Sequence, residues 1–390
     1  MVSLSSTAVV AAVALVVPMA LRLINLRLPS TVGEILLGIV IGPQVLNWAR
    51  VDEPVQVLAT VGLAFLLLLS GLEIEFQRLR GRVLRLTSVA FVTSFALAAG
   101  VGQLLGASGL VRSPLLFAVV LSATSLGIIL PILKDAGQAE TSFGQVVIAG
   151  ASIAEVIPIV LLSLLFAEHA PGIGSQLVLL AAFIVFVAAF GLLIFGLERL
   201  PRITQTLIGL QETTAEIRVR GAFALLCLFA ALAAHFGLEA ILGAFLAGAT
   251  LKLLDRDEHA THALFRTKLR AVGFGVFVPF FFISTGMTID LRTLADAPST
   301  LARVPIFVAA LLLVRAVPAV LYRPLARRRS QLVGAGLLQA TSLSIPVVAG
   351  MIGVDLQLIT PGTYAALVTA GLLTVIVFPL LATRMLRDAS

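Results

Sequence analysis

Long apolar runs separated by short polar connections make up nearly the whole chain. Each run approaches the roughly 20 residues that a helix needs to cross a lipid bilayer. The second and ninth runs are short and rich in glycine. The pattern predicts an all-α polytopic membrane protein of about thirteen transmembrane helices, forming one membrane domain over residues 1–390, with the first run retained as a helix and not cleaved. The runs cover residues 5–24, 31–48, 55–75, 84–107, 113–134, 145–167, 175–197, 216–236, 238–254, 269–287, 300–323, 331–352 and 361–385.

Composition excludes a water-soluble globule. Hydrophobic residues make up 59% of the chain and charged residues 12%, whereas a soluble domain carries about 25% charged residues. Cys227 is the single cysteine, which excludes an internal disulfide and a Cys-rich metal site. The net charge of +7 comes from short basic strings between apolar runs, which indicates membrane topology and not nucleic-acid binding.

The basic residues also predict the orientation. Of the 27 Lys and Arg residues, 22 fall in connections after odd-numbered runs, four fall in the opposite connections, and Arg315 lies inside a run. Lys and Arg near the ends of spans stay on the cytoplasmic side. We therefore expect an extracellular N-terminus and a cytoplasmic C-terminus in the cell membrane.

Three short strings recur in the same order in the two halves of the chain. The matched runs lie seven apart, so their orientation reverses, which predicts the inverted-topology repeat of a secondary transporter. We expect repeat one over 5–167, a linker helix over 175–197 and repeat two over 216–385. The paired strings are 34–38 with 239–243, 70–75 with 285–290, and 121–128 (LSATSLGI) with 338–345 (LQATSLSI).

The two Ala-Thr-Ser-Leu strings predict interrupted helices. Thr124 and Ser125 in one string, and Thr341 and Ser342 in the other, lie in mid-run with a proline shortly after. Two broken helices at matching positions would expose carbonyls and helix ends that bind ions near the bilayer midplane. Packing of small residues between helices is the alternative interpretation of either string alone.

Two charged residues, Glu155 and Arg315, stand out because they lie well inside apolar runs and away from the run ends. Glu155 lies in the middle of the sixth run, where a carboxylate costs at least about 2.5 kcal/mol unless it is paired, protonated or facing water. A proton and a cation can compete for such a group, which is the chemistry of exchange. Arg315 stays charged, so it does not carry the proton. We expect it to contact Glu155 or the broken-helix ends; a structural acid–arginine pair and snorkelling of Arg315 to an interface are the alternatives.

The other candidate residues are less central. Glu34, Glu73 and Glu239 lie near the ends of runs, where they either line an entry vestibule or, as we favour, meet headgroup water. His259 and His262 lie in a charged connection and are expected to be solvated. The sequence has no phosphate loop, dinucleotide fingerprint, catalytic triad or zinc constellation, so we expect neither an enzyme nor a cofactor.

Four sequence strings, which overlap the segments described above, together resemble the monovalent cation:proton antiporter superfamily. The similarity is to its sodium/hydrogen exchanger membrane domain, in the branch that includes potassium-efflux and sodium–proton antiporters, and it extends over essentially the whole chain. It implies thirteen helices, a dimerisation domain and a core domain with elevator-like alternation, and a homodimer. The strings lie at 29–43, 67–73, 122–128 and 280–287.

The resemblance also implies site residues. Glu155 takes the position of the ion-binding acid of the sixth helix, which is usually Asp, and Ala154 stands where many members have Asp, Asn or Gln. Arg315 matches a position that is Lys in electrogenic exchangers and often Arg in electroneutral ones. Ser152 adds a hydroxyl one turn before the acid. The residues that match the crossing of the two broken helices are Thr124, Ser125, Gln339, Thr341 and Ser342.

The expected function is exchange of Na⁺ or K⁺ for H⁺ by alternating access, since hard oxygen donors suit either cation. A single acid at the centre predicts electroneutral exchange. The chain ends at Ser390, shortly after the last run, so we expect a nucleotide-binding regulatory domain of the potassium-efflux type only as a separate subunit. An organic anion symporter of the same architecture and a non-transporting membrane scaffold are the alternative functions.

Overall fold

The structure is a computed structural model that describes residues 4–23, 29–74, 78–166, 173–198, 216–254, 260–289, 298–326 and 328–387. Within these residues, eleven helices are long and apolar enough to cross a membrane. Two shorter apolar helices, over 30–41 and 240–253, correspond to the glycine-rich second and ninth runs. Each of the thirteen predicted runs thus corresponds to a continuous or interrupted helix in the described part of the chain.

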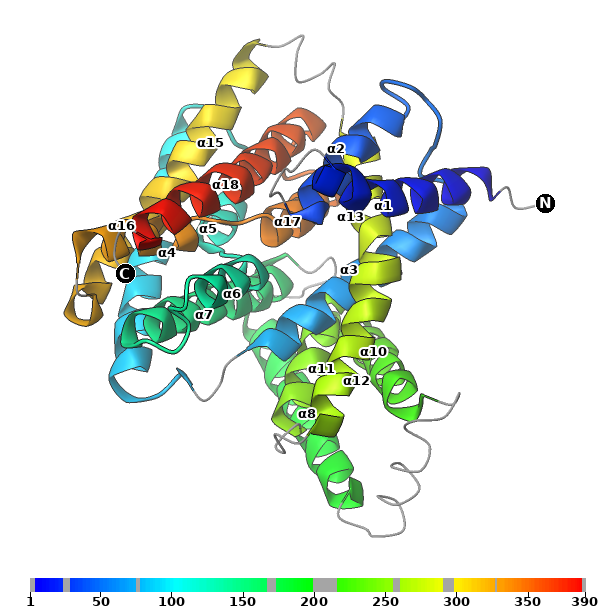
Figure 1. Cartoon of the computed structure of the whole chain (residues 1–390), viewed down its shortest axis with the longest axis horizontal. Coiled ribbons are helices and arrows are strands. Elements are labelled where there is room, and N and C mark those ends of the chain that lie inside the picture. Colours follow the sequence, from blue (N-terminus) through cyan, green and yellow to red (C-terminus); the bar gives the residue numbers. More distant parts are fainter. Residues whose placement is uncertain are drawn as a thin grey trace. The chain divides into compact units, whose positions relative to one another are not determined.

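The helices follow the predicted runs closely (Figure 1). The first half contains α1 (Ser5–Leu23), α2 (Ser30–Ile41), α3 (Glu53–Glu73), α4 (Gly81–Ala107), α5 (Pro114–Ser122), α6 (Leu126–Asp135), α7 (Ser142–Leu165) and α8 (Ile173–Glu198). The second half contains α10 (Ile217–His235), α11 (Ala240–Leu254), α12 (Ala260–Val272), η2 (Gly273–Phe277), α13 (Val278–Thr288), α15 (Pro298–Ala316), η3 (Pro318–Leu325), α16 (Arg329–Gln339), α17 (Ser344–Asp355) and α18 (Pro361–Arg387).

Two boundaries differ from the prediction by more than three residues. The second run extends to residue 48, but α2 ends at Ile41 because Gly42 leaves the helical conformation and Pro43 has no N–H with which to continue the helix. The tenth run begins at 269, whereas α12 begins at Ala260, in a charged stretch that lowers the local hydropathy. That helix then passes through the π-helical turn η2 before α13.

The chain forms two compact units. Unit 1 contains residues 52–74 and 163–282, and unit 2 contains residues 3–51, 75–162 and 283–390. Each unit therefore combines segments from both halves of the sequence. The half-helices α5, α6, α16 and α17 all belong to unit 2.

In unit 1, glycines bring α3 and α11 into backbone contact. A Cβ atom on Gly248 would lie 1.9 Å from the Leu68 carbonyl oxygen, and one on Gly71 would lie 2.2 Å from the Phe245 carbonyl oxygen. Small residues let helices approach this closely in membranes, where close packing replaces the hydrophobic effect as the main attraction between helices. The α3–α11 contact therefore requires glycine at both positions.

We expect Gly248→Ala to destabilise the protein by about 3 kcal/mol or more, because the methyl group would overlap backbone atoms that cannot move independently. The melting temperature in detergent measures this effect. Gly221→Ala on α10 is the matched control, because a Cβ there meets nothing within 4 Å. Equal melting temperatures for Gly248→Ala and the wild type would contradict this account of the α3–α11 contact.

In unit 2, the half-helices α6 and α16 share a hydrophobic core. Residues of α6, α7, η3, α16 and α18 form one buried cluster, which includes Leu133, Val147, Tyr322, Leu338 and Leu386. α18 lies along α15, α16 and α17 (Figure 1). This core packs α6 and α16 against α7, the helix that carries Glu155.

Candidate functional site

Both Ala-Thr-Ser-Leu strings interrupt a helix, as predicted. The first break separates α5 from α6 at residues 123–125, and the second separates α16 from α17 at residues 340–343. The two breaks are hydrogen-bonded to each other. The Ser125 N–H donates to the Thr341 carbonyl (3.0 Å), and the Leu343 N–H donates to Ser125 Oγ (3.1 Å). The unwound backbone is thus satisfied by protein groups within a buried region.

A proline in α7 explains how the first break is anchored. Pro158 has no N–H, so the carbonyl of Ala154, four residues earlier, loses its partner within the helix. That carbonyl instead accepts a hydrogen bond from the Thr124 N–H at 3.1 Å. The residue next to the acid therefore contributes its backbone to the crossing, although its side chain is only a methyl group.

Glu155 lies at the beginning of a half-helix. Its side chain is 3% exposed, and its Oε2 accepts a hydrogen bond of 3.3 Å from the N–H of Leu126, the first residue of α6. The first N–H groups of a helix lack partners within the helix, and the helix dipole there favours negative charge. This position therefore stabilises the carboxylate in a buried environment.

Arg315 reaches the same crossing from α15. Its guanidinium, in a side chain that is 4% exposed, donates from Nε to Thr124 Oγ1 at 2.8 Å and from Nη1 to Ser94 Oγ at 3.0 Å. Gln339 accepts twice, through its carbonyl oxygen (3.4 Å, from Nε) and through Oε1 (from Nη2). The expectation that Arg315 contacts the broken-helix ends is confirmed. The snorkelling alternative is wrong, because the guanidinium lies within the buried crossing.

Thr374 of α18 supports the second break. Its Oγ1 accepts from the Ser342 N–H at 3.2 Å and lies 3.2 Å from the Ser342 carbonyl oxygen, to which it can donate. The Gly371 carbonyl, at 2.8 Å, is the alternative acceptor for the single hydrogen of this hydroxyl. The Ser342 hydroxyl itself is fully buried and has no hydrogen-bond partner among the described residues. One hydroxyl on α18 thus replaces helical partners that the break removes.

This arrangement can hold one small cation or one proton. A buried carboxylate, hydroxyl oxygens and the backbone of two unwound segments converge in unit 2, with a fixed positive charge beside them. Hard oxygen donors of this kind suit monovalent and other hard cations. Broken helices that meet a buried acid are the architecture of ion sites in secondary transporters.

Comparison with known proteins assigns the chain to a family. The sequence pattern of the family described as sodium/hydrogen exchanger, transmembrane, matches residues 11–388. The chain belongs to the sodium/hydrogen exchanger family. It is therefore a multi-pass membrane protein, as its helices indicate.

Several relatives of this chain are named as Na(+)/H(+) antiporters. The chain is 28% identical to the putative Na(+)/H(+) antiporter YjbQ of Bacillus subtilis, over 97% of this chain and 62% of that protein. It is 26% identical to the probable Na(+)/H(+) antiporter 3 of Methanocaldococcus jannaschii, over 95% of this chain and 94% of that protein. The chain thus spans less than two thirds of the Bacillus protein and nearly all of the archaeal one.

A solved structure confirms the fold. The sodium proton antiporter MjNhaP1 from Methanocaldococcus jannaschii at pH 8 matches with a TM-score of 0.68 and 16% identity, over 98% of this chain and 97% of that chain. The all-α polytopic fold predicted from the apolar runs is therefore that of a sodium–proton antiporter.

Several of the site residues predicted from the sequence lie together. Thr124, Ser125, Glu155, Arg315, Gln339, Thr341 and Ser342 all contribute to the hydrogen bonds of the crossing or to its unwound segments. Ser152 is fully buried one turn before Glu155, but its hydroxyl donates to the Ile148 carbonyl of its own helix at 3.0 Å. The hydroxyl hydrogen of Ser152 is therefore already used in a hydrogen bond within α7.

The other predicted acids do not belong to the crossing. Glu34 on α2 is 5% exposed, and its Oε2 has no hydrogen-bond partner among the described residues, so its placement in headgroup water is wrong. Within unit 1, Glu73 ends α3 and forms an ion pair with Arg270, and Glu239 donates its N–H to Ser163 Oγ at 3.0 Å. His259 and the side chain of His262 lie outside the described residues.

Sequence reasoning missed Ser94 and Thr374. Ser94 accepts from Arg315 and donates to the Val314 carbonyl at 2.8 Å, and Thr374 holds the second break. Each is a single hydroxyl in a long apolar helix. The mid-span position of a polar side chain is the only signal for either residue in the sequence, and it does not separate these two from hydroxyls that bond within their own helix.

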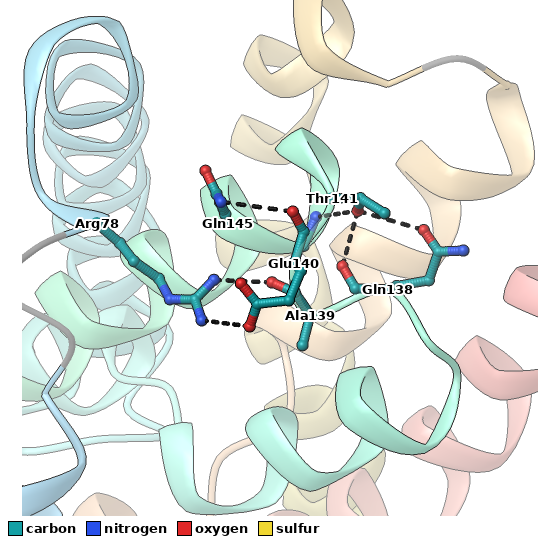
Figure 2. A network of polar contacts seen from close by, with 7 residues as sticks. Arg78, Gln138, Ala139, Glu140, Thr141 and Gln145 are labelled. Atoms are coloured by element: carbon teal, nitrogen blue, oxygen red, sulfur yellow. Dashed lines mark hydrogen bonds and ion pairs between the residues drawn. The ribbon is translucent and has the colours of Figure 1, made fainter. Parts of the chain in front are cut away.

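A second polar network fixes the connection between α6 and α7 (Figure 2). Arg78 donates to the Ala139 carbonyl at 2.8 Å and forms an ion pair with Glu140 at 2.9 Å. Thr141 Oγ1 accepts from the Gly144 N–H at 3.0 Å and so caps the start of α7. The Glu140 side chain is largely exposed, so its ion pair contributes little. These contacts hold the connection between α6 and α7 in place, and none of their groups belongs to the crossing of the broken helices.

Proposed function

We propose that this protein is a secondary active transporter that exchanges Na⁺ or K⁺ for H⁺, with Glu155 as the carboxylate shared by cation and proton. One observation carries the proposal: a buried carboxylate at the start of a half-helix, where two broken helices cross. The names of the antiporter relatives support the substrate class. They also favour a transporter over an enzyme.

The chemistry follows from the cost of burying charge. A carboxylate in a low-dielectric site needs a compensating positive charge, which a proton or a small cation can supply equally well. The Leu126 N–H and the dipole of α6 stabilise the anionic form only in part. Binding of one ion therefore favours release of the other, which couples the two fluxes.

Electroneutral exchange is the proposed stoichiometry. Glu155 is the acid that contacts the crossing, and its neighbour Ala154 offers a carbonyl and no second carboxylate. Arg315 keeps its charge throughout, so it contributes no proton. One cation would then exchange for one proton, with no net charge moved.

We further propose alternating access by elevator-like motion in a homodimer of the cell membrane. The halves 5–167 and 216–385 would be inverted repeats joined by the linker helix over 175–197, with the N-terminus outside and the C-terminus in the cytoplasm. Support comes from the paired breaks at Thr124–Ser125 and Thr341–Ser342, and from two units that each draw on both halves of the chain. The distribution of basic residues supports the orientation.

Proton flux in proteoliposomes tests this function. Vesicles holding a pH gradient receive Na⁺, K⁺ or Li⁺ in turn, and a pH-sensitive dye reports the gradient. We expect a saturable, cation-triggered collapse, unchanged in rate when a membrane potential of either sign is imposed. A dependence on potential with tight coupling would contradict the one-for-one stoichiometry.

Folded protein that responds to none of the three cations would contradict antiport itself. An organic anion symporter would then require flux of that solute driven by a sodium gradient. A scaffold would show neither flux.

A further inference from the structure

Among the described residues, the hydrogen-bond acceptors of the buried Arg315 guanidinium are neutral oxygens. Its acceptors are the hydroxyls of Ser94 and Thr124 and the two oxygens of Gln339. Hydrogen bonds of this kind satisfy the guanidinium N–H groups but leave its positive charge uncancelled. The field of that charge therefore extends into the crossing, where its effect depends on its distance from Glu155.

Gln339 connects this charge to the helix that carries the acid. Its Oε1 accepts from Arg315 Nη2, and its Nε2 donates to the Val147 carbonyl of α7 at 2.8 Å. Val147 lies two helical turns before Glu155 on the same helix. The side-chain amide thus bonds both the guanidinium and α7, as Thr124 also does through its hydroxyl and its backbone N–H.

A glycine on α7 makes room for this amide. A Cβ atom on Gly150 would lie 2.9 Å from Gln339 Nε2 and 2.2 Å from the Tyr322 hydroxyl. Gln339 is almost completely buried and is the last residue of α16, immediately before the second break. Its side chain therefore has little freedom to take another orientation.

We propose that Gln339 is a positioning residue that fixes the Arg315 charge relative to Glu155 and thereby sets the affinity of the site for the transported cation. This inference rests on the proposed function. A guanidinium released from the amide can turn about its remaining contacts toward the carboxylate. An arginine–carboxylate pair would then compete with the cation for Glu155.

Two substitutions of Gln339 are expected to act in opposite directions. Gln339→Met keeps the length of the side chain but removes both hydrogen bonds, so the half-saturating cation concentration should rise roughly tenfold. Gln339→Glu keeps an acceptor for Arg315 and adds a negative charge that offsets the guanidinium. At alkaline pH, the half-saturating concentration for this variant should fall roughly tenfold.

The measurement is the KM for the cation in proteoliposomes, with the maximal rate recorded alongside it. We expect KM to move and the maximal rate to stay within about twofold, as for a change in ground-state binding. Gln331→Met and Gln331→Glu are the matched controls, because Gln331 lies on the same helix, is also buried and caps the first turn of α16 at Arg328. They should leave KM unchanged.

A binding readout keeps the test independent of transport. The Na⁺ concentration that gives half of the cation-induced rise in melting temperature should shift with KM in each variant. Shifts of the two Gln339 variants in the same direction, or no shift, would overturn the inference. If Gln339→Met does not fold, the direction of Gln339→Glu alone decides. If instead the proposed antiport function were wrong, the wild type itself would show no cation-triggered flux. That result is distinct from failure of the Gln339 inference, in which the wild type exchanges normally.

Discussion

Replacing Glu155 with glutamine is expected to abolish cation-triggered collapse of a pH gradient, reducing the rate at least about 100-fold. Glutamine retains an oxygen that can accept from the Leu126 N–H, so the start of α6 keeps its partner. What is lost is the negative charge that compensates a cation and the group that binds a proton. Proton flux in proteoliposomes with Na⁺, K⁺ or Li⁺ measures the effect.

Glu155→Asp is the matched control for this substitution. It retains the carboxylate on a side chain one methylene shorter. We expect measurable exchange with altered affinity. Wild-type exchange in a folded Glu155→Gln variant would exclude Glu155 as the shared carboxylate, while leaving the family assignment intact.

Replacing Arg315 with alanine is expected to remove both exchange and several kcal/mol of stability. The substitution leaves acceptors on Ser94, Thr124 and Gln339 without their shared donor, and each unsatisfied buried group costs about 1–3 kcal/mol. The cavity left by the side chain adds to this cost. Melting temperature in detergent and flux in proteoliposomes provide the two measurements.

Arg303→Ala provides a control on the same helix. Arg303 lies three turns earlier on α15 and donates to Thr363 at 2.8 Å, away from the crossing. We expect a much smaller loss of stability and continued exchange. Unchanged transport and an unchanged melting temperature in Arg315→Ala would show that the guanidinium does not hold the crossing together.

The sequence predicted the fold because a membrane simplifies the problem. Each span must satisfy its own backbone in lipid, so apolar length alone locates the helices. The breaks at Thr124–Ser125 and Thr341–Ser342 were predictable for a related reason, since the same polar string recurs with a proline shortly after it. Glu155 and Arg315 were found because charge inside a span is rare and costly.

The remaining parts of the site depend on contacts that no local pattern encodes. Ser94 meets Arg315 across 221 positions of sequence, and Thr374 meets Ser342 across 32. A hydroxyl in an apolar helix can bond its own backbone as easily as a distant partner. Glu34 was misplaced because its position near the end of a run suggested an interface, whereas its burial depends on how neighbouring helices cover it.

The bond between Thr124 and Ala154 has a consequence for how the protein could move. Because Pro158 has no N–H for the Ala154 carbonyl, separating the first break from α7 would leave a donor and an acceptor unpaired in a buried region. Such a pair costs several kcal/mol in a lipid-like environment. Sliding α7 past the broken helices is therefore disfavoured. If the acid is displaced across the bilayer, α7 and both unwound segments would have to move together as one rigid body.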